Sequence, residues 1–150
     1  MSNDNFFGRV SENQDIKGFV MALKYDRAGL VTVVVQDALT GDVLMLAHAD
    51  RKAVRKTLET GVMHFYSRSR KKMWRKGEES GNEQLLENLY VDCDGDALVA
   101  QVRQVKAACH LGYRSCFSNH VDRNGRVINV GRKVDDPRKM YGKKKSARGS

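Results

Sequence analysis

Residues 30–47 read LVTVVVQDALTGDVLMLA, and this stretch decides the fold. Residues 30–36 are rich in β-branched side chains, which favour an extended strand. Thr40 and Gly41 are typical of a turn, and the apolar residues 43–47 then return as a second strand. The stretch therefore predicts a β-hairpin at the centre of the molecule.

The flanking sequence adds one helix and several further strands. Asp50 can cap a helix that ends at Gly61, and the apolar stripe between them has helical spacing: Ala53, Val54, Thr57 and Leu58. Further strands are predicted at residues 62–67, 89–94, 97–105 and 127–130. A doubly wound α/β fold would need more helices between the strands. The sequence therefore predicts a mixed, strand-rich fold.

The chain of 150 residues suits one domain, which we expect at residues 18–137 between a flexible lead-in (1–17) and a basic tail (138–150). The tail supplies six of the nine net positive charges, so three remain for the other residues. It is interpreted as a solvated tail, with a nucleic-acid arm as the alternative. No apolar run approaches the roughly 20 residues of a membrane helix, and no secretory signal is visible, so a cytoplasmic location is expected.

An acidic segment, VDCDGD at residues 91–96, is the strongest pointer to a hard metal ion. In an extended backbone Asp92, Asp94 and Asp96 would share one face, with Cys93 on the other. Three adjacent carboxylates repel one another unless a cation lies among them, and oxygen ligands favour Mg²⁺ or Ca²⁺. An EF-hand is excluded because Ala97 and Arg103 stand where it needs Gly and Glu. A solvated acidic turn is the alternative.

The three cysteines, Cys93, Cys109 and Cys116, do not form a disulfide pattern, because their number is odd and no CxxC is present. On one helix Cys109 and Cys116 would lie about 10 Å apart, too far for one zinc ion. Gly112 favours a loop instead. Three thiolates would leave a fourth position for water, the pattern of catalytic zinc; inert thiols are the alternative. His110 is either a general acid–base group beside such a metal or a packed imidazole.

Residues 67–81, SRSRKKMWRKGEESG, combine hydroxyl groups, guanidinium groups and a tryptophan. Arg68 and Arg70 can fork onto phosphate oxygens, and Ser67 and Ser69 supply neutral donors. Trp74 can stack on a base or pack in the core. The stretch is therefore a candidate substrate-binding segment, with a loose basic loop as the alternative.

Taken together, these segments closely resemble the phosphoribosyl-AMP cyclohydrolase family of histidine biosynthesis. The matching stretches occur in the same order over roughly residues 33–117: 36–37, 40–47, 57–61, 66–70, 74–78, 80–81, 91–98, 108–110, 112 and 114–117. Only 33 residues follow Phe117, too few for the pyrophosphohydrolase domain fused in some relatives. The resemblance therefore implies the stand-alone enzyme.

The resemblance also implies a fold, metals and partners. The family fold is a buckled mixed β-sheet or pseudobarrel with a few helices, in an intertwined homodimer. The resemblance places one zinc per subunit between the chains, on Cys93 of one chain and Cys109 and Cys116 of the other. It places magnesium on Asp92, Asp94 and Asp96. A small nucleotide is the expected substrate, with neither nucleic acid nor membrane as a partner.

The implied reaction opens the adenine ring of phosphoribosyl-AMP at the N1–C6 bond, giving the formimino-aminoimidazole carboxamide ribonucleotide. Zinc would activate the attacking water, and His110 would move the proton. Two alternatives are a zinc nucleobase deaminase, whose HxE and PCxxC signature is absent, and a zinc nucleic-acid-binding module, whose finger spacing is absent.

Overall fold

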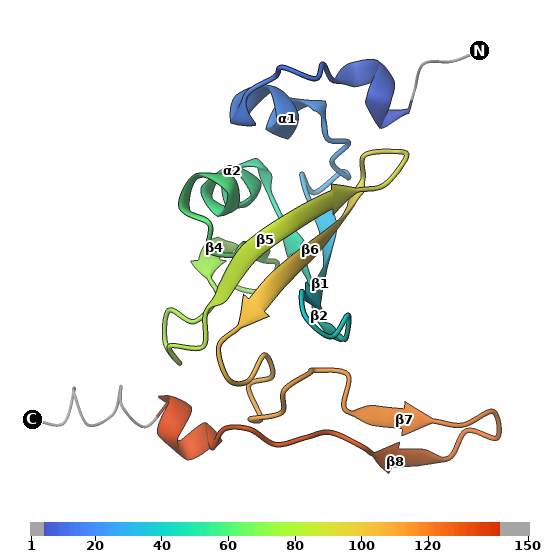
Figure 1. The fold of residues 1–150 in the computed structure, drawn as a ribbon, viewed down its shortest axis with the longest axis vertical. Coiled ribbons are helices and arrows are strands. Elements are labelled where there is room, and N and C mark those ends of the chain that lie inside the picture. The colour runs from blue at the N-terminus through green and yellow to red at the C-terminus, as the bar shows by residue number, and fades with distance from the viewer. Residues whose placement is uncertain (1–4, 142–150) are drawn as a thin grey trace, which may run out of the picture.

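A four-stranded mixed sheet forms the centre of the computed structural model, which describes residues 5–141 (Figure 1). Its strands are β1 (Val31–Asp37), β2 (Val43–Ala49), β5 (Gln84–Val91) and β6 (Ala97–Gln104), in the order β2-β1-β6-β5. β1 runs parallel to β6, and the other two pairs are antiparallel. Val31, Val33 and Val35 alternate into the core because side chains of a strand point to opposite faces. The predicted hairpin and mixed, strand-rich fold are confirmed.

The predicted helix is α2 (Arg51–Thr60), and both of its predicted ends are confirmed. The Asp50 carboxylate accepts a hydrogen bond from Ala53 N over 2.8 Å at the first turn. Gly61 ends the helix in the left-handed conformation, with φ of 75°. The buried stripe of Ala53, Val54 and Thr57 faces the core, so the helix covers part of the sheet.

The lead-in contains two helices that were not predicted, η1 (Phe6–Arg9) and α1 (Ile16–Ala22), so the expected boundary at residue 17 falls inside α1. Phe6 is buried and meets Phe19 edge-on, with ring centroids 5.8 Å apart. Both helices are shorter than two full turns. Helices this short are stabilised mainly by packing against the rest of the protein, so the sequence pattern does not reveal them.

Several strands differ from the prediction. β5 begins at Gln84, five residues earlier than expected, and ends at Val91, so residues 92–96 form a turn and not an extended segment. The expected basic loop contains β4 (Lys72–Arg75), which pairs with β3 (His64–Ser67). β7 (Asn119–Val121) pairs with β8 (Val127–Asn129) in a hairpin that projects from the body (Figure 1). β4 is charged and short, so it depends on its partner strand.

Within residues 5–141 the strands form three separate sheets, and none closes into a barrel in one chain. A helical turn over residues 137–141 includes the first four residues of the expected tail, and Met140 is only 4% exposed. Residues 142–150 of that tail lie outside the described part of the chain. No helix among residues 5–141 is long and apolar enough to cross a membrane.

Candidate active site

Cys109 and Cys116 meet in an irregular loop at the carboxyl end of β6, as the loop interpretation predicts. Gly112 N donates to Cys109 O over 2.9 Å, and Cys116 N donates to Leu44 O, the second residue of β2, over 2.7 Å. Cys116 is exposed as a residue, but its thiol faces Cys109. Burial of that thiol, followed by the charge of Cys109, raises its pKa to about 11. The chain thus brings two thiols together at one end of the sheet.

Arg114 fixes this loop to the ends of two strands. Its guanidinium group forms an ion pair with the Asp37 carboxylate at the end of β1. It also donates to the carbonyl oxygens of Gln104 and Lys106, each over 3.1 Å. Burial opposes ionisation of Asp37, yet hydrogen bonds from Leu39 N and from Arg114 hold its pKa below the ordinary value. These contacts of Arg114 therefore hold the loop that carries Cys116 against the ends of β1 and β6.

Lys76 reaches the same loop from the segment that follows β4. Its Nζ donates to Ala108 O over 2.6 Å and lies 5.8 Å from the centre of the Trp74 ring. Burial lowers the pKa of Lys76, and the nearby charges of Cys116 and Cys109 oppose that shift. A cation thus lies beside the thiol pair, where it favours the thiolate form.

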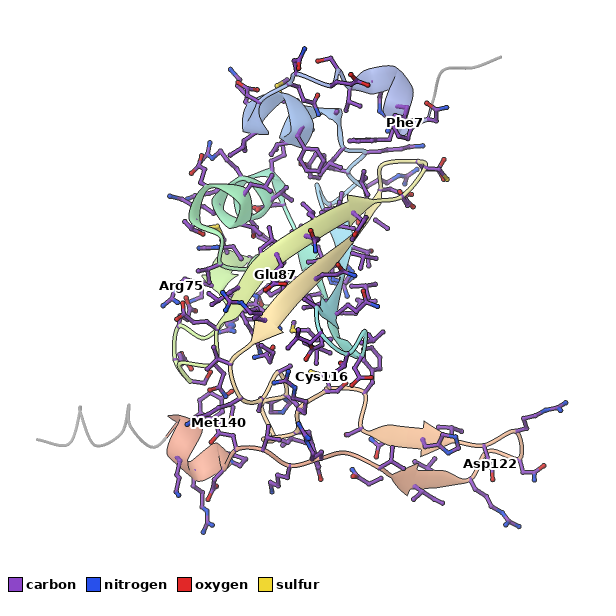
Figure 2. All side chains as sticks on the ribbon, in the orientation of Figure 1. Phe7, Arg75, Glu87, Cys116, Asp122 and Met140 are labelled. Atoms are coloured by element: carbon purple, nitrogen blue, oxygen red, sulfur yellow. The ribbon has the colours of Figure 1, made fainter. Side chains whose placement is uncertain are left out.

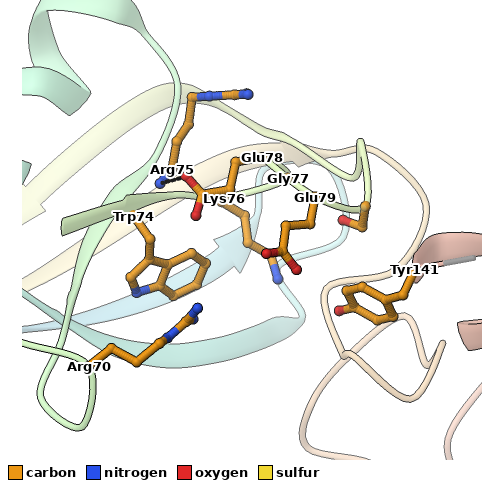
Figure 3. A pocket seen from close by; sticks show the side chains of 9 residues that line it. Arg70, Trp74, Arg75, Lys76, Gly77, Glu78, Glu79 and Tyr141 are labelled. Carbon is orange, nitrogen blue, oxygen red and sulfur yellow. Dashed lines mark hydrogen bonds between the residues drawn. The ribbon is translucent and has the colours of Figure 1, made fainter. Parts of the chain in front are cut away.

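A pocket of about 100 Å³ borders this lysine (Figure 3). It is lined by residues 74–80 together with Arg70 and Tyr141. Trp74 also packs on Phe65, with ring centroids 5.1 Å apart, so one side of its ring belongs to the core. Within the lining, Arg75 N donates a hydrogen bond to the Glu78 carboxylate over 3.3 Å. The pocket offers cations and an aromatic ring next to the thiol pair.

The candidate substrate-binding residues do not all lie in that pocket. Arg70 and Trp74 line it, whereas Ser67 ends β3 and Arg68 and Ser69 lie in the turn that follows. The Ser67 hydroxyl lies 3.3 Å from that of Ser69 and accepts from Arg70 N over 3.2 Å. These hydroxyl groups therefore shape the turn that carries Arg70.

The acidic cluster is at the opposite end of the sheet, in the turn between β5 and β6. Ligand atoms of Asp92, Asp94 and Asp96 all lie within 4.8 Å of one another. They converge because Asp92 accepts from Gly95 N and Asp96 N, over 2.8 and 3.1 Å, and not because of strand alternation. A hydrogen bond with Asp92, followed by burial, raises the pKa of Asp96. The three carboxylates could therefore hold a metal ion.

Cys93 lies in this acidic turn, far from the other two cysteines. Its carbonyl oxygen accepts from Phe6 N over 2.8 Å, which ties it to η1. Figure 2 labels Phe7 of η1 beyond one end of the central sheet and Cys116 near the other end. The eight residues of β6 separate the two ends, a length of about 23 Å at 3.3 Å per residue. Cys93 cannot join Cys109 and Cys116 within one chain.

His110 is exposed on the Cys109 loop. Sequence reasoning assigned no role to Lys76, Arg114 or Tyr141. Lys76 and Arg114 lie in the matched motifs at residues 74–78 and 114–117, so the family resemblance could have pointed to them as functional residues. Tyr141 falls in the basic tail, where composition gave no signal.

Comparison with known proteins supports the resemblance. The family model described as phosphoribosyl-AMP cyclohydrolase matches residues 45–118. A phosphoribosyl-AMP cyclohydrolase of Methanoregula boonei is 50% identical over 124 residues, which cover 83% of this chain and 98% of the relative. That of Pelotomaculum thermopropionicum is 53% identical over 123 residues, covering 82% and 95%. That of Rhodopseudomonas palustris is 46% identical over 132 residues, covering 85% and 90%.

Proposed function

This chain belongs to the phosphoribosyl-AMP cyclohydrolase family, and from that membership we propose how its residues perform the reaction. It is a hydrolase of histidine biosynthesis that adds water across the N1–C6 bond of phosphoribosyl-AMP. The observation that carries the residue assignment is the separation of the cysteines, two at one end of the sheet and one at the other. Zinc is held between two copies of the chain, by Cys109 and Cys116 of one and Cys93 of the other.

The donor set suits zinc. Thiolates are preferred zinc ligands, and two thiols already face each other beside a lysine cation. Three protein ligands leave one coordination position, the arrangement of catalytic sites. Zinc held there would supply a water molecule whose pKa is lowered toward 7.

The geometry of one chain supports assembly as a homodimer. The two ends of β6 are about 23 Å apart, whereas two thiolates on one zinc, each about 2.3 Å from it, are at most roughly 5 Å apart. The projecting β7–β8 hairpin also exposes apolar side chains: Val121, Val127 and Ile128 are each 58–63% exposed. An isolated hairpin is only marginally stable in water, so a second copy is the surface that would cover it.

The remaining groups position the substrate and move a proton. Oxygen from water bonds to C6, the N1–C6 bond breaks, and N1 gains a proton. His110, which follows Cys109 in the chain and is exposed, delivers that proton. Arg70 and the Ser67–Ser69 turn, with Arg68, bind phosphate, and Trp74 stacks on the base. Asp92, Asp94 and Asp96 hold magnesium, whose preferred ligands are oxygen atoms.

The activity is tested by mixing purified protein with phosphoribosyl-AMP and following ring opening by ultraviolet absorbance. We expect turnover that a zinc chelator removes and that added Zn²⁺ restores. Turnover that persists after zinc is shown to be gone would exclude the zinc mechanism.

The shared site is tested by complementation between two inactive variants, Cys93→Ala and Cys109→Ala. Refolded together, they form heterodimers in which one site carries both substitutions and the other is intact. About half of the parent activity per heterodimer is expected. Cys93→Ala refolded with itself is the matched control. Heterodimers without activity would contradict a site shared between the two chains.

A further inference from the structure

The segment of residues 131–141, called the C-terminal strap here, lies across the loop that carries Cys109 and Cys116. Val134 N and Asp135 N both donate to Gly112 O, over 2.9 and 3.1 Å. Arg114 N donates to Arg132 O over 2.8 Å. These backbone bonds join the strap to the part of the loop that lies between Cys109 and Cys116.

Side chains fix the strap from a second direction. Asn82 Nδ2 donates to the Asp135 carboxylate over 3.0 Å, and Asn82 is only 2% exposed. Gly112 makes the close approach possible, since a Cβ there would collide with Asp135 O. The strap is therefore packed against the loop that carries Cys109 and Cys116.

The helical turn at the end of the strap directs Tyr141 toward the pocket. Met140 N and Lys139 N donate to Asp136 O, each over 2.9 Å, and the Met140 side chain is buried (Figure 2). Tyr141 follows directly and is 38% exposed. Figure 3 shows its hydroxyl pointing into the pocket, across from Trp74 and Lys76.

We propose that the C-terminal strap places Tyr141 in the wall of the substrate pocket and that Tyr141 donates a hydrogen bond to the adenine nucleotide bound there. This inference rests on the proposed function, because it takes the nucleotide as the occupant of the pocket. Trp74 offers an indole ring and Tyr141 a neutral donor from the opposite wall. The charged lining residues are the cations Arg70, Arg75 and Lys76 and the carboxylates Glu78 and Glu79, so the cations outnumber the acids by one. Such a combination suits a flat heteroaromatic ring that carries phosphate.

The test uses AMP as the probe and Trp74 as the reporter, since Trp74 is the only tryptophan in the sequence. AMP should change the fluorescence of the full-length parent protein in a saturable way. In Tyr141→Phe, which removes only the hydroxyl, the Kd for AMP should rise roughly three- to ten-fold, the effect of one hydrogen bond. The KM for phosphoribosyl-AMP should rise by a similar factor, with kcat within about two-fold of the parent.

Tyr90→Phe is the matched control, because Tyr90 is 55% exposed on β5, away from the pocket. It should bind AMP as the parent does. Zinc content and the circular dichroism spectrum should be unchanged in both variants, which excludes a purely structural effect. Tyr141→Phe with parental Kd and KM would overturn the inference, as would a parent whose Trp74 fluorescence does not respond to AMP. Ring opening by the parent is measured separately, so failure of the proposed function can be distinguished.

Discussion

Arg114 and Asp37 form the most buried ion pair among residues 5–141, and this pair holds the loop that carries Cys109 and Cys116. The Asp37 side chain is 5% exposed and that of Arg114 27%. Removing one partner of such a pair leaves the other charge buried without compensation. The pair therefore couples the stability of the fold to the shape of the cysteine loop.

Asp37→Asn should lower the free energy of unfolding by about 3 kcal/mol, the cost of breaking a buried pair. Chemical denaturation at pH 7 measures this value. Asp42→Asn is the matched control, since Asp42 is exposed in the same turn. Equal losses in the two variants would mean that the Arg114 contact contributes nothing specific.

The same ion pair predicts how stability depends on pH. The pKa of Asp37 in the folded chain is below its ordinary value of 3.8, against the effect of burial and owing to the Leu39 and Arg114 hydrogen bonds. Its stabilising contribution is thus fully present above the unfolded pKa and is lost as the pH falls through the folded pKa. The difference between parent and Asp37→Asn should be constant from pH 7 to about 5 and shrink below about pH 4. Denaturation curves across that range check this; a difference that grows on acidification would contradict it.

Each cysteine should be needed for zinc. Cys93→Ala, Cys109→Ala and Cys116→Ala should each lose most of the tightly bound metal and all turnover, since two remaining thiolates hold zinc far more weakly. Zinc per chain, measured by atomic absorption after desalting, is the readout. Full zinc content and activity in any one of the three would remove that residue from the ligand set.

At the scale of elements, Gly112 joins the cysteine loop to the C-terminal strap. Its φ is +91°, and a Cβ would also meet Asp135 O. Gly125, at the tip of the β7–β8 hairpin, has a φ of +83° with nothing within 4 Å of a Cβ. The two glycines share a positive φ, which a side chain rarely adopts, but Gly112 is buried with a close neighbour whereas Gly125 is exposed with none.

Gly125→Ala should therefore lower the free energy of unfolding by about 1–2 kcal/mol, the backbone penalty alone. Gly112→Ala should lower it clearly more. Gly112→Ala should also raise the Kd of AMP, because the strap that carries Tyr141 is displaced. Thermal unfolding and the Trp74 titration measure the two effects. Equal losses of stability and equal Kd values for AMP in the two variants would contradict the link between Gly112 and the position of the strap.

The β5–β6 turn carries candidate ligands for two different metals, the aspartates for magnesium and Cys93 for zinc. Asp94→Asn and Asp96→Asn should weaken the dependence of activity on Mg²⁺ while zinc content stays near that of the parent, because carboxylates and thiolates differ in softness. Both measurements belong on one preparation, with circular dichroism as the folding control. Zinc loss in proportion to activity would instead make the carboxylates part of the zinc site.

At the scale of the whole molecule, the proposed ligand set would leave one chain with an incomplete site. If zinc is bound between two copies, dilution should remove activity and zinc together as the dimer dissociates. Analytical ultracentrifugation gives the dimer Kd, and specific activity against concentration should have its midpoint near that value. Activity that stays constant well below the dimer Kd would contradict the shared site.

Sequence alone determined the elements whose signals are local. The β-branched run at residues 31–35 predicts β1, and Asp50 and Gly61 mark both ends of α2. The order of motifs was enough to identify the family, since the residue types for thiolate and carboxylate chemistry are readable from the chain. Only the tertiary structure decided which of these residues meet. Cys93 is separated from Cys109 and Cys116 by the length of β6, and Tyr141 reaches the pocket through a strap docked on Gly112. These relations depend on strand pairing and backbone contacts between distant segments, which leave no periodic signal in the sequence.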